Sequence, residues 1–173
     1  MASSSHLKRA ARIRLLLMDC DGVLTDGRIH LLDDGSEMKS FHVRDGQGLA
    51  LWHRAGGLSG VVSGRASLAL EVRARELGIH FVRQGVGDKV AAFESLLAEA
   101  NACAAEVAFI GDDLADVPLM RRVGFAVAVA DACIEARRAA HHVTKKAGGH
   151  GAVRELIELL LRAQKKWRLL VPR

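Results

Sequence analysis

Two aspartates set two positions apart are the clearest sign of chemistry in this sequence. Asp19 and Asp21 follow the largely apolar run 13–18, which is typical of a buried strand. Side chains at positions i and i+2 of an extended chain point the same way, so both carboxylates should face one small volume. Two like charges that close repel, and a bound cation or a shared proton would offset the repulsion. Carboxylate oxygens favour a hard cation such as Mg²⁺, so the pair predicts a magnesium site.

The glycines that follow these acids indicate turns. Gly22 would let the backbone reverse sharply and approach a ligand closely. Asp26-Gly27 is an ordinary turn dipeptide, and a turn is enough to explain it. A turn does not need an acid that is still on the strand, so Asp19 and Asp21 remain candidates for a catalytic or metal-binding role.

Two further polar residues, Ser63 and Lys89, are candidates for binding a phosphate. Ser63 comes after the run 58–62 and could cap the next helix, or offer its hydroxyl with the Gly64 amide to a phosphate. Lys89 opens a predicted helix, where a cation is mildly unfavourable unless it holds an anion. These residues therefore have both a structural and a phosphate-binding interpretation.

A second acidic cluster follows the apolar run 107–110. Asp112 and Asp113 repeat the chemistry of the first strand end, and Asp116 could be an ordinary helix cap. Three acids here, added to the two at the first strand, would form a costly cluster without a metal. The combination of two acids, a hydroxyl, a lysine and a second acidic cluster is far more specific than any single member.

The elements that must position these residues alternate between short apolar runs and helical patterns. Such alternation predicts an α/β fold, a Rossmann-like parallel sheet with helices on both faces, in which ligands bind at the carboxyl ends of the strands. The expected strands are 13–20, 58–63, 79–83, 106–111 and 125–129, and the expected helices are 48–55, 65–77, 89–100, 116–123, 132–139 and 152–166.

One segment breaks the alternation directly after the first acidic motif. Residues 28–43 read as a β-hairpin, because two short extended runs flank Asp-Asp-Gly, and we expect a small flap beside the site. The organisation we predict is a flexible N-terminus over 1–12, a single domain over 13–166 and a C-terminal tail over 167–173.

Composition limits the partners. The 173 residues carry a formal net charge of +5, which suits an acidic small molecule. With 4% aromatic residues and no tyrosine, stacking on single strands is disfavoured, and we expect no nucleic-acid partner. No apolar run approaches the ~20 residues that span a bilayer, so we expect no membrane partner. Cys20, Cys103 and Cys133 have no metal-ligand spacing and read as reduced thiols, which predicts a cytoplasmic protein.

Four motifs, in order along the chain, resemble those of the haloacid dehalogenase-like phosphatase superfamily. The run 19–27 (Asp-Cys-Asp-Gly-Val-Leu-Thr-Asp-Gly) is similar to the first motif, Ser63 to the second, Lys89 to the third and the run 111–116 to the fourth. The resemblance covers about residues 15–160, nearly the whole chain. Two departures are small: Cys20 stands where an aliphatic residue is more usual, and Ser63 where threonine is also common.

Within the superfamily, the runs 23–27, 39–48 and 148–155 are similar to the subgroup that hydrolyses phosphates of 2-keto sugar acids. The resemblance implies a Mg²⁺-dependent phosphatase of lipopolysaccharide precursor synthesis that acts on an octulosonate 8-phosphate, with a nonulosonate 9-phosphate as the alternative substrate. Such enzymes lack a large cap domain and are typically homotetramers in which a neighbouring subunit helps to close each site. We therefore expect a homotetramer.

The resemblance also implies roles for the acids. Asp19 would be the nucleophile that becomes an aspartyl-phosphate, and Asp21 the general acid and then the general base. Mg²⁺ would be held by Asp19, by the backbone carbonyl of Asp21 and by Asp112. Asp113 or Asp116 would orient a metal-bound water or the lysine ammonium, and the sequence does not separate these two roles.

The remaining candidates would bind the substrate. By resemblance, Ser63, Gly64 and Lys89 would hold the phosphoryl oxygens. Arg65 and Arg73 could bind the sugar-acid carboxylate, since eight residues are about two helical turns and would place both on one helix face. Arg73 could equally lie on a charged helix surface.

His150 sits among glycines and could reach the site. The other histidines are expected on the surface or in loops.

Two hypotheses from other classes of protein are alternatives to a phosphatase. A phosphorylatable receiver domain also uses acids, a hydroxyl and a lysine on a parallel sheet, but there the lysine comes late, whereas Lys89 precedes the second acidic cluster. A non-catalytic assembly domain of the same fold should have lost Asp19, Asp21 or Asp112, and all three are present.

Overall fold

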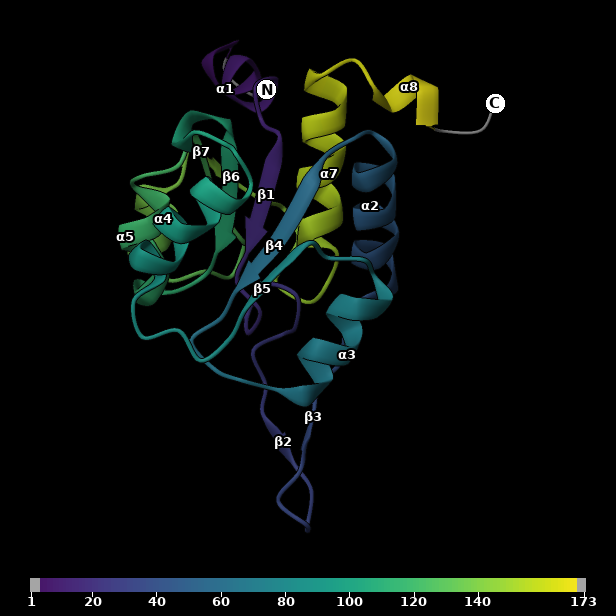
Figure 1. Ribbon diagram of the computed structural model, residues 1–173, viewed down its shortest axis with the longest axis vertical. Helices are drawn as coiled ribbons and strands as arrows, with labels where there is room; N and C mark the ends of the chain where they lie inside the picture. Colours follow the sequence, from purple (N-terminus) through teal and green to yellow (C-terminus); the bar gives the residue numbers. More distant parts are fainter. Residues whose placement is uncertain (1–3, 171–173) are drawn as a thin grey trace.

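The computed structural model describes residues 4–170, in which the central feature is a parallel sheet of six strands. The strand order is β5-β4-β1-β6-β7-β8, so the first strand lies in the middle and the chain winds outward from it in both directions (Figure 1). The strands are β1 (Leu15–Met18), β4 (Leu58–Val62), β5 (Phe81–Arg83), β6 (Val107–Gly111), β7 (Phe125–Ala128) and β8 (His142–Val143).

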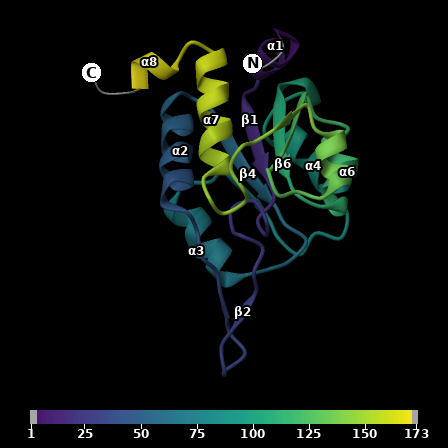
Figure 2. The ribbon, with the colours of Figure 1, turned by 180° about the vertical axis from the view of Figure 1, so that it is seen from behind.

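Helices cover both faces of the sheet, as Figures 1 and 2 show from opposite sides. One face carries α2 (Val43–Arg54), α3 (Leu68–Glu76) and α7 (Ala152–Ala163), and the other carries α4 (Lys89–Glu99), α5 (Val117–Met120) and α6 (Ile134–Ala139). The described ends form two short helices, α1 (Ser4–Ala10), which packs against α7, and α8 (Trp167–Leu170). Two 3₁₀ turns complete the list, Ala104–Glu106 and Leu114–Asp116.

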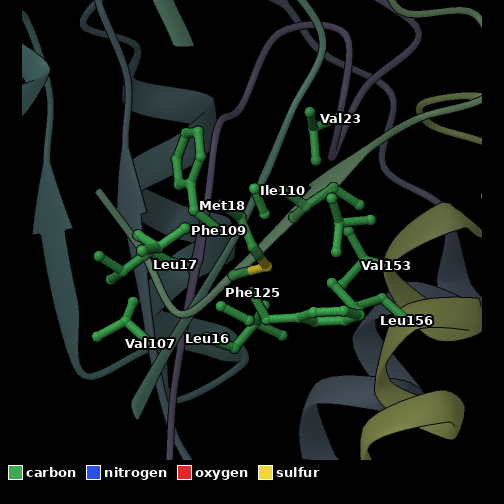
Figure 3. Packing of buried hydrophobic residues seen from close by; sticks show 14 of the residues in the cluster. Leu16, Leu17, Met18, Val23, Val107, Phe109, Ile110, Phe125, Val153 and Leu156 are labelled. Atoms are coloured by element: carbon green, nitrogen blue, oxygen red, sulfur yellow. The ribbon is translucent and has the colours of Figure 1, made fainter. Parts of the chain in front are cut away.

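Strand β1 is buried along its whole length, because it has a neighbour on each edge and helices on each face. Its side chains alternate between the two faces, and Val153 and Leu156 reach from α7 into the same cluster (Figure 3). In register, Met18 lies opposite Val61 of β4 and Ile110 of β6. The residues that follow these three strands must therefore converge at one edge, which confirms the expected α/β sheet.

A two-stranded antiparallel hairpin leaves that edge directly after the first motif. It consists of β2 (His30–Leu31) and β3 (Glu37–Met38), and it projects from the body of the molecule at the bottom of Figure 1. The expectation of a small flap is thus confirmed. Its large apolar side chains are exposed, namely Ile29, Leu31, Leu32 and Met38.

The strands match the predicted runs to within a few residues, but two helices start three or more residues away from the expected position. Helix α2 begins at Val43 rather than residue 48, because the His42 ring accepts a hydrogen bond from the Arg44 N–H (3.2 Å) and caps it. Helix α3 begins at Leu68 rather than residue 65. Arg65 therefore lies in the preceding loop, and the prediction that Arg65 and Arg73 share a helix face is wrong.

Three further differences concern short elements. Strand β8 has only two residues, too few to give an alternating pattern. Residues 4–10 form α1 where we expected a flexible segment, since burial of Ala10 and packing on α7 order this helix. Part of the predicted tail forms α8, while residues 1–3 and 171–173 lie outside the described structure.

Within residues 4–170, no helix combines the length and the apolar composition needed to cross a bilayer.

Candidate active site

The site is centred on Asp19, the first residue beyond β1. Its backbone N–H donates to the Ile110 carbonyl (3.0 Å), so the chain stays paired with β6 up to this point. The side chain is buried, with 11% exposed, and its Oδ1 accepts a hydrogen bond from Lys89 Nζ (2.8 Å). Seventy residues of sequence separate these two groups, which the parallel sheet brings together.

The loop after β1 is closed by a threonine that sequence reasoning did not single out. Thr25 is buried, and its Oγ1 accepts hydrogen bonds from the N–H groups of Gly22 (3.4 Å) and Gly27 (3.2 Å). Both glycines have positive φ, 86° and 78°, a backbone conformation that side chains disfavour. Asp26 Oδ1 accepts from the Arg28 N–H (3.1 Å), which confirms the turn interpretation of Asp26.

Lys89 bridges the two acidic motifs. The Lys89 side chain is 8% exposed. Its ammonium also donates a hydrogen bond to Asp116 Oδ1 (2.7 Å). Asp116 Oδ2 accepts from the N–H groups of Asp112 (2.9 Å) and Asp113 (3.3 Å). Asp116 is therefore the residue that orients Lys89 and shapes the loop after β6, whereas the Asp113 side chain is exposed. Of the two candidates that the sequence left open, only Asp116 contacts Lys89.

Asp112 has the features of a metal ligand. Its Oδ1 is buried without a hydrogen-bond partner, and a Cβ at Gly22 would lie 2.1 Å from its Oδ2. Asp19, Asp112 and Asp116 each place a carboxylate oxygen within 4.8 Å of the others. An orphaned buried carboxylate oxygen beside two further acids fits a hard divalent cation. Because both Asp116 oxygens already accept hydrogen bonds, Asp19 and Asp112 are the better ligands of the three.

The charges of this cluster are not balanced by the protein alone. Burial, followed by the nearby charge of Asp116, raises the pKa of Asp19 to about 6. Burial, followed by the charges of Asp19 and Asp116, raises the pKa of Asp112 to about 8. Burial opposes the charge of Lys89, but Asp19 and Asp116 outweigh it and raise the lysine pKa. The single positive charge of Lys89 thus faces three carboxyl groups, and a divalent cation would balance the remaining negative charge when all three are ionised.

Ser63 lies where β4 reaches the same edge. It is buried, its N–H donates to the Arg83 carbonyl (2.8 Å), and its Oγ accepts from the Arg65 N–H (3.3 Å). The helix starts only at Leu68, so the interpretation of Ser63 as a helix cap is wrong. Gly64 is exposed, and a Cβ placed there would lie 3.8 Å from the Val86 carbonyl oxygen, an ordinary contact distance.

The side chain of Asp21 faces the hairpin rather than the acidic cluster. Its Oδ1 makes a short hydrogen bond with Lys39 Nζ, and Arg65 Nη1 lies 3.6 Å from its Oδ2. Lys39 follows β3 and opens the run 39–48 that resembles the subgroup, but the sequence alone gave it no role. Arg65 thus lies beside Asp21, and it also pairs with Glu37 of the hairpin (2.6 Å).

Two other candidates lie apart from Asp19. Arg73 pairs with Glu76 (2.8 Å), and a Cβ at Gly46 in α2 would lie 2.6 Å from its Nη2. Within residues 4–170 Arg73 makes no ion pair with Asp21, Glu37 or any other acid of the site. His150 is exposed and lines a separate surface cavity of about 590 Å³ with Arg44.

The two glycines before His150 lie where the loop before α7 has no room for a side chain. A Cβ at Gly148 would lie 1.7 Å from the Gly22 carbonyl oxygen, and one at Gly149 would lie 2.4 Å from the Asp26 nitrogen. The segment before α7 therefore presses its backbone directly against the loop after β1. The dipeptide Gly148-Gly149 was the signal in the sequence that could have indicated this contact.

Comparisons with known proteins agree with this geometry. Residues 70–156 match the family described as haloacid dehalogenase-like hydrolase. The 3-deoxy-D-manno-octulosonate 8-phosphate phosphatase of Yersinia pestis is 46% identical over 160 residues, which are 92% of this chain and 86% of the relative. Its crystal structure superposes with a TM-score of 0.94 at 45% identity, and the match covers 95% of this chain and 89% of that one.

A second solved structure carries ligands. It is the Moraxella catarrhalis 3-deoxy-D-manno-octulosonate 8-phosphate phosphatase in complex with a magnesium ion, a phosphate ion and the sugar acid. That structure has a TM-score of 0.94 and 38% identity, with 96% of each chain covered.

The fold and the matched motif region define a haloacid dehalogenase-like hydrolase. Within that class, the identity over nearly the whole chain shows that the protein belongs to the family of 3-deoxy-D-manno-octulosonate 8-phosphate phosphatases.

Proposed function

We propose that this protein is a Mg²⁺-dependent phosphatase that converts 3-deoxy-D-manno-octulosonate 8-phosphate into the free sugar acid and phosphate. The observation that carries the proposal is the buried cluster of Asp19, Lys89, Asp112 and Asp116 at the carboxyl edge of the sheet. The proposal is also supported by the names of relatives that match nearly the whole chain. The product would enter the synthesis of lipopolysaccharide precursors.

In this mechanism Asp19 is the nucleophile. One of its oxygens attacks phosphorus, the bond from phosphorus to the sugar oxygen breaks, and an aspartyl-phosphate forms. Asp21 gives a proton to the departing sugar oxygen and then takes a proton from the water that attacks the aspartyl-phosphate. Phosphate leaves and Asp19 is regenerated. Lys89 orients the Asp19 carboxylate through a 2.8 Å hydrogen bond, which supports the assignment of Asp19 as the nucleophile.

The placement of the side chains supports a set of metal and phosphate ligands. Asp19, Asp112 and the Asp21 backbone carbonyl would hold Mg²⁺, and the orphaned Oδ1 of Asp112 supports this set. When bound, Mg²⁺ supplies positive charge that lets an anionic carboxylate meet an anionic phosphate. Ser63, the Gly64 amide and Lys89 would hold the phosphoryl oxygens.

Arg65 is the better placed of the two arginines for the sugar-acid carboxylate. Both arginines pair with a glutamate, Arg65 with Glu37 and Arg73 with Glu76, but the Arg65 side chain is 41% exposed and lies beside Asp21, whereas that of Arg73 is 20% exposed and lies on α3. A planar guanidinium can bind a carboxylate with two parallel hydrogen bonds, which suits a 2-keto acid.

We further propose a homotetramer in the cytoplasm, with residues 13–166 as its catalytic domain. Support for assembly comes from the hairpin, because Leu31, with 71% of its surface exposed, and Met38, with 48%, are large apolar side chains without cover. Support for a reducing compartment comes from the three cysteines, which are all free thiols.

The decisive test is phosphate release from a panel of substrates, with and without Mg²⁺. The panel contains the octulosonate 8-phosphate, nonulosonate 9-phosphates and ordinary hexose phosphates. We expect a strong Mg²⁺-dependent preference for the octulosonate. A preference for a nonulosonate would keep the mechanism and change the substrate, and no turnover of any member would contradict a catalytic role.

A further inference from the structure

Four charged side chains form a closed ring of alternating sign at the base of the hairpin. Lys39 lies between Asp21 and Glu37, with its Nζ hydrogen-bonded to Asp21 Oδ1 and 2.8 Å from Glu37 Oε1. Arg65 completes the ring, with Nη2 2.6 Å from Glu37 Oε2 and Nη1 3.6 Å from Asp21 Oδ2. Each carboxyl group thus contacts both cations.

The hairpin supplies two members of this ring. Glu37 lies on β3 and Lys39 follows it at i+2, so an extended chain directs both side chains to the same side. Met38, between them, points outward and is 48% exposed, while the Lys39 side chain is only 2% exposed. An otherwise exposed flap therefore buries one lysine against the body of the protein. Such burial is costly unless the charge is paired, and here it is paired twice.

The ring fixes the orientation of Asp21. The Asp21 side chain is 23% exposed, and within the described residues its oxygens contact no charged groups other than Lys39 and Arg65. A free aspartate would rotate between rotamers, whereas an acid that must meet a particular leaving oxygen has to be held to within about 0.5 Å. Lys39 should orient Asp21 more strongly than Arg65 does, because Lys39 makes a direct hydrogen bond to Asp21 whereas Arg65 lies 3.6 Å from it.

We propose that Lys39 is a positioning residue for Asp21, delivered to the site by the hairpin. This inference rests on the proposed function, in which Asp21 transfers the proton to the leaving group. Among the described residues, Lys39 forms ion pairs with Asp21 and Glu37 and none with Asp19, the proposed nucleophile. Its effect should therefore depend on how much the leaving group needs a proton.

The variant Lys39→Met tests this dependence, since it keeps the length of the side chain and removes the charge. A sugar alkoxide is a poor leaving group that needs protonation, whereas p-nitrophenolate leaves without it. We expect kcat/KM for the sugar phosphate to fall on the order of 100-fold, the scale of general-acid catalysis. For p-nitrophenyl phosphate, kcat/KM should stay close to that of the unmodified protein.

Two controls accompany the variant. Lys145→Met removes an exposed lysine from the same edge of the sheet and should leave both substrates unaffected. Glu37→Gln keeps the shape of the hairpin but weakens the second contact of Lys39, and should give a smaller loss of the same kind. Hydrogen exchange of the backbone amides reports on order without activity: Lys39→Met should speed exchange in residues 20–25, and Lys145→Met should not.

Equal loss of kcat/KM on both substrates would overturn the inference, because Lys39 would then act on the phosphoryl group or on the fold. Unchanged kinetics on both substrates would also overturn it. Failure of the unmodified protein to hydrolyse either compound would instead contradict the proposed function. In that case the exchange measurement alone decides whether Lys39 holds the loop that carries Asp21.

Discussion

At the scale of single residues, burial and crowding define the site. Asp19 and Asp112 have raised pKa values, about 6 and about 8, mainly because they are buried, and Lys89 and Asp116 are fixed between them by hydrogen bonds. A carboxylate that is buried, unpaired and close to other acids is unfavourable for the fold by itself. Its presence supports the proposed role of Asp112 as a ligand of Mg²⁺.

Asp19→Asn should abolish turnover and leave the fold intact. Asparagine matches aspartate in shape and can still accept a hydrogen bond from Lys89, but its amide does not attack phosphorus. Loss of a nucleophile elsewhere lowers kcat by about 10⁴-fold or more, and we expect a drop of that order. Phosphate release measures the loss of turnover, and circular dichroism checks that the fold is intact. Retained turnover would remove Asp19 from the nucleophile role.

The raised pKa values predict how metal and pH act together. Without metal, Asp19 and Asp112 bind protons more tightly in the folded than in the unfolded protein, so stability falls as pH rises from about 4 to about 8. Mg²⁺ needs deprotonated ligands, and its binding should strengthen over the same range. The increase in Tm on adding Mg²⁺ should be larger at pH about 8 than at pH about 5.

Differential scanning fluorimetry at the two pH values measures this effect. Asp112→Asn is the matched variant, because it removes one proposed ligand and one of the crowded charges. Its Tm should hardly respond to Mg²⁺ at either pH. The same Mg²⁺ shift in Tm at both pH values would contradict the assignment of these acids as ligands.

The acids at the strand ends were easier to predict from the sequence than the residues that contact and position them. Asp19, Asp21 and Asp112 stand within three residues of the end of an apolar run, where parallel-sheet geometry makes strand ends meet. Thr25 and Lys39 were missed, because each works through contacts that only the folded loop and hairpin create. Arg73 was placed near the site on helical spacing alone, and the helix turned out to begin three residues later than expected.

At the scale of elements, α2 and α7 are joined by a buried carboxylate. Asp45 of α2 is 2% exposed, and its Oδ1 accepts a hydrogen bond from the Arg154 N–H in the first turn of α7 (2.7 Å). The first turn of a helix has N–H groups without partners in its own helix, and a carboxylate from a neighbouring helix satisfies one here. The contact fixes where α7 starts relative to α2.

Asp45→Ala should therefore lower the free energy of unfolding by about 1–3 kcal/mol, the value of a hydrogen bond to a charged group. Urea unfolding followed by circular dichroism measures the change. Asp33→Ala, in the exposed turn of the hairpin, is the control and should shift stability by less than about 0.5 kcal/mol. Equal midpoints for both variants would show that the Asp45 contact contributes nothing.

The long elements could be predicted because their apolar patterns are strong. Strand β1 is four consecutive buried residues, and α7 carries a continuous apolar stripe, so each is visible without its neighbours. Strand β8 and helix α1 could not be predicted in this way. The first has two residues, and the second depends on its packing against α7 rather than on its own sequence.

At the scale of the whole molecule, the hairpin exposes apolar surface far from the N-terminal helix (Figure 1). Monomeric proteins rarely leave several large apolar side chains together in water. If the hairpin is where subunits meet, Leu31→Glu should convert the assembly to smaller species. Sedimentation velocity measures the change, and Leu7→Glu on α1 is the control that should leave the assembly intact. An unchanged assembly of Leu31→Glu would place the subunit contact elsewhere.

Cys20 lies between the two acids of the first motif, where it is fully buried and packs with the core. Burial, followed by the charge of Asp21, raises the pKa of its thiol to about 12. Peroxide and alkylating agents react with thiolates, and this thiol does not form one at any physiological pH. We therefore expect Cys20 to resist oxidation although it sits next to the proposed nucleophile, and its covalent labelling should measure how often the loop after β1 opens.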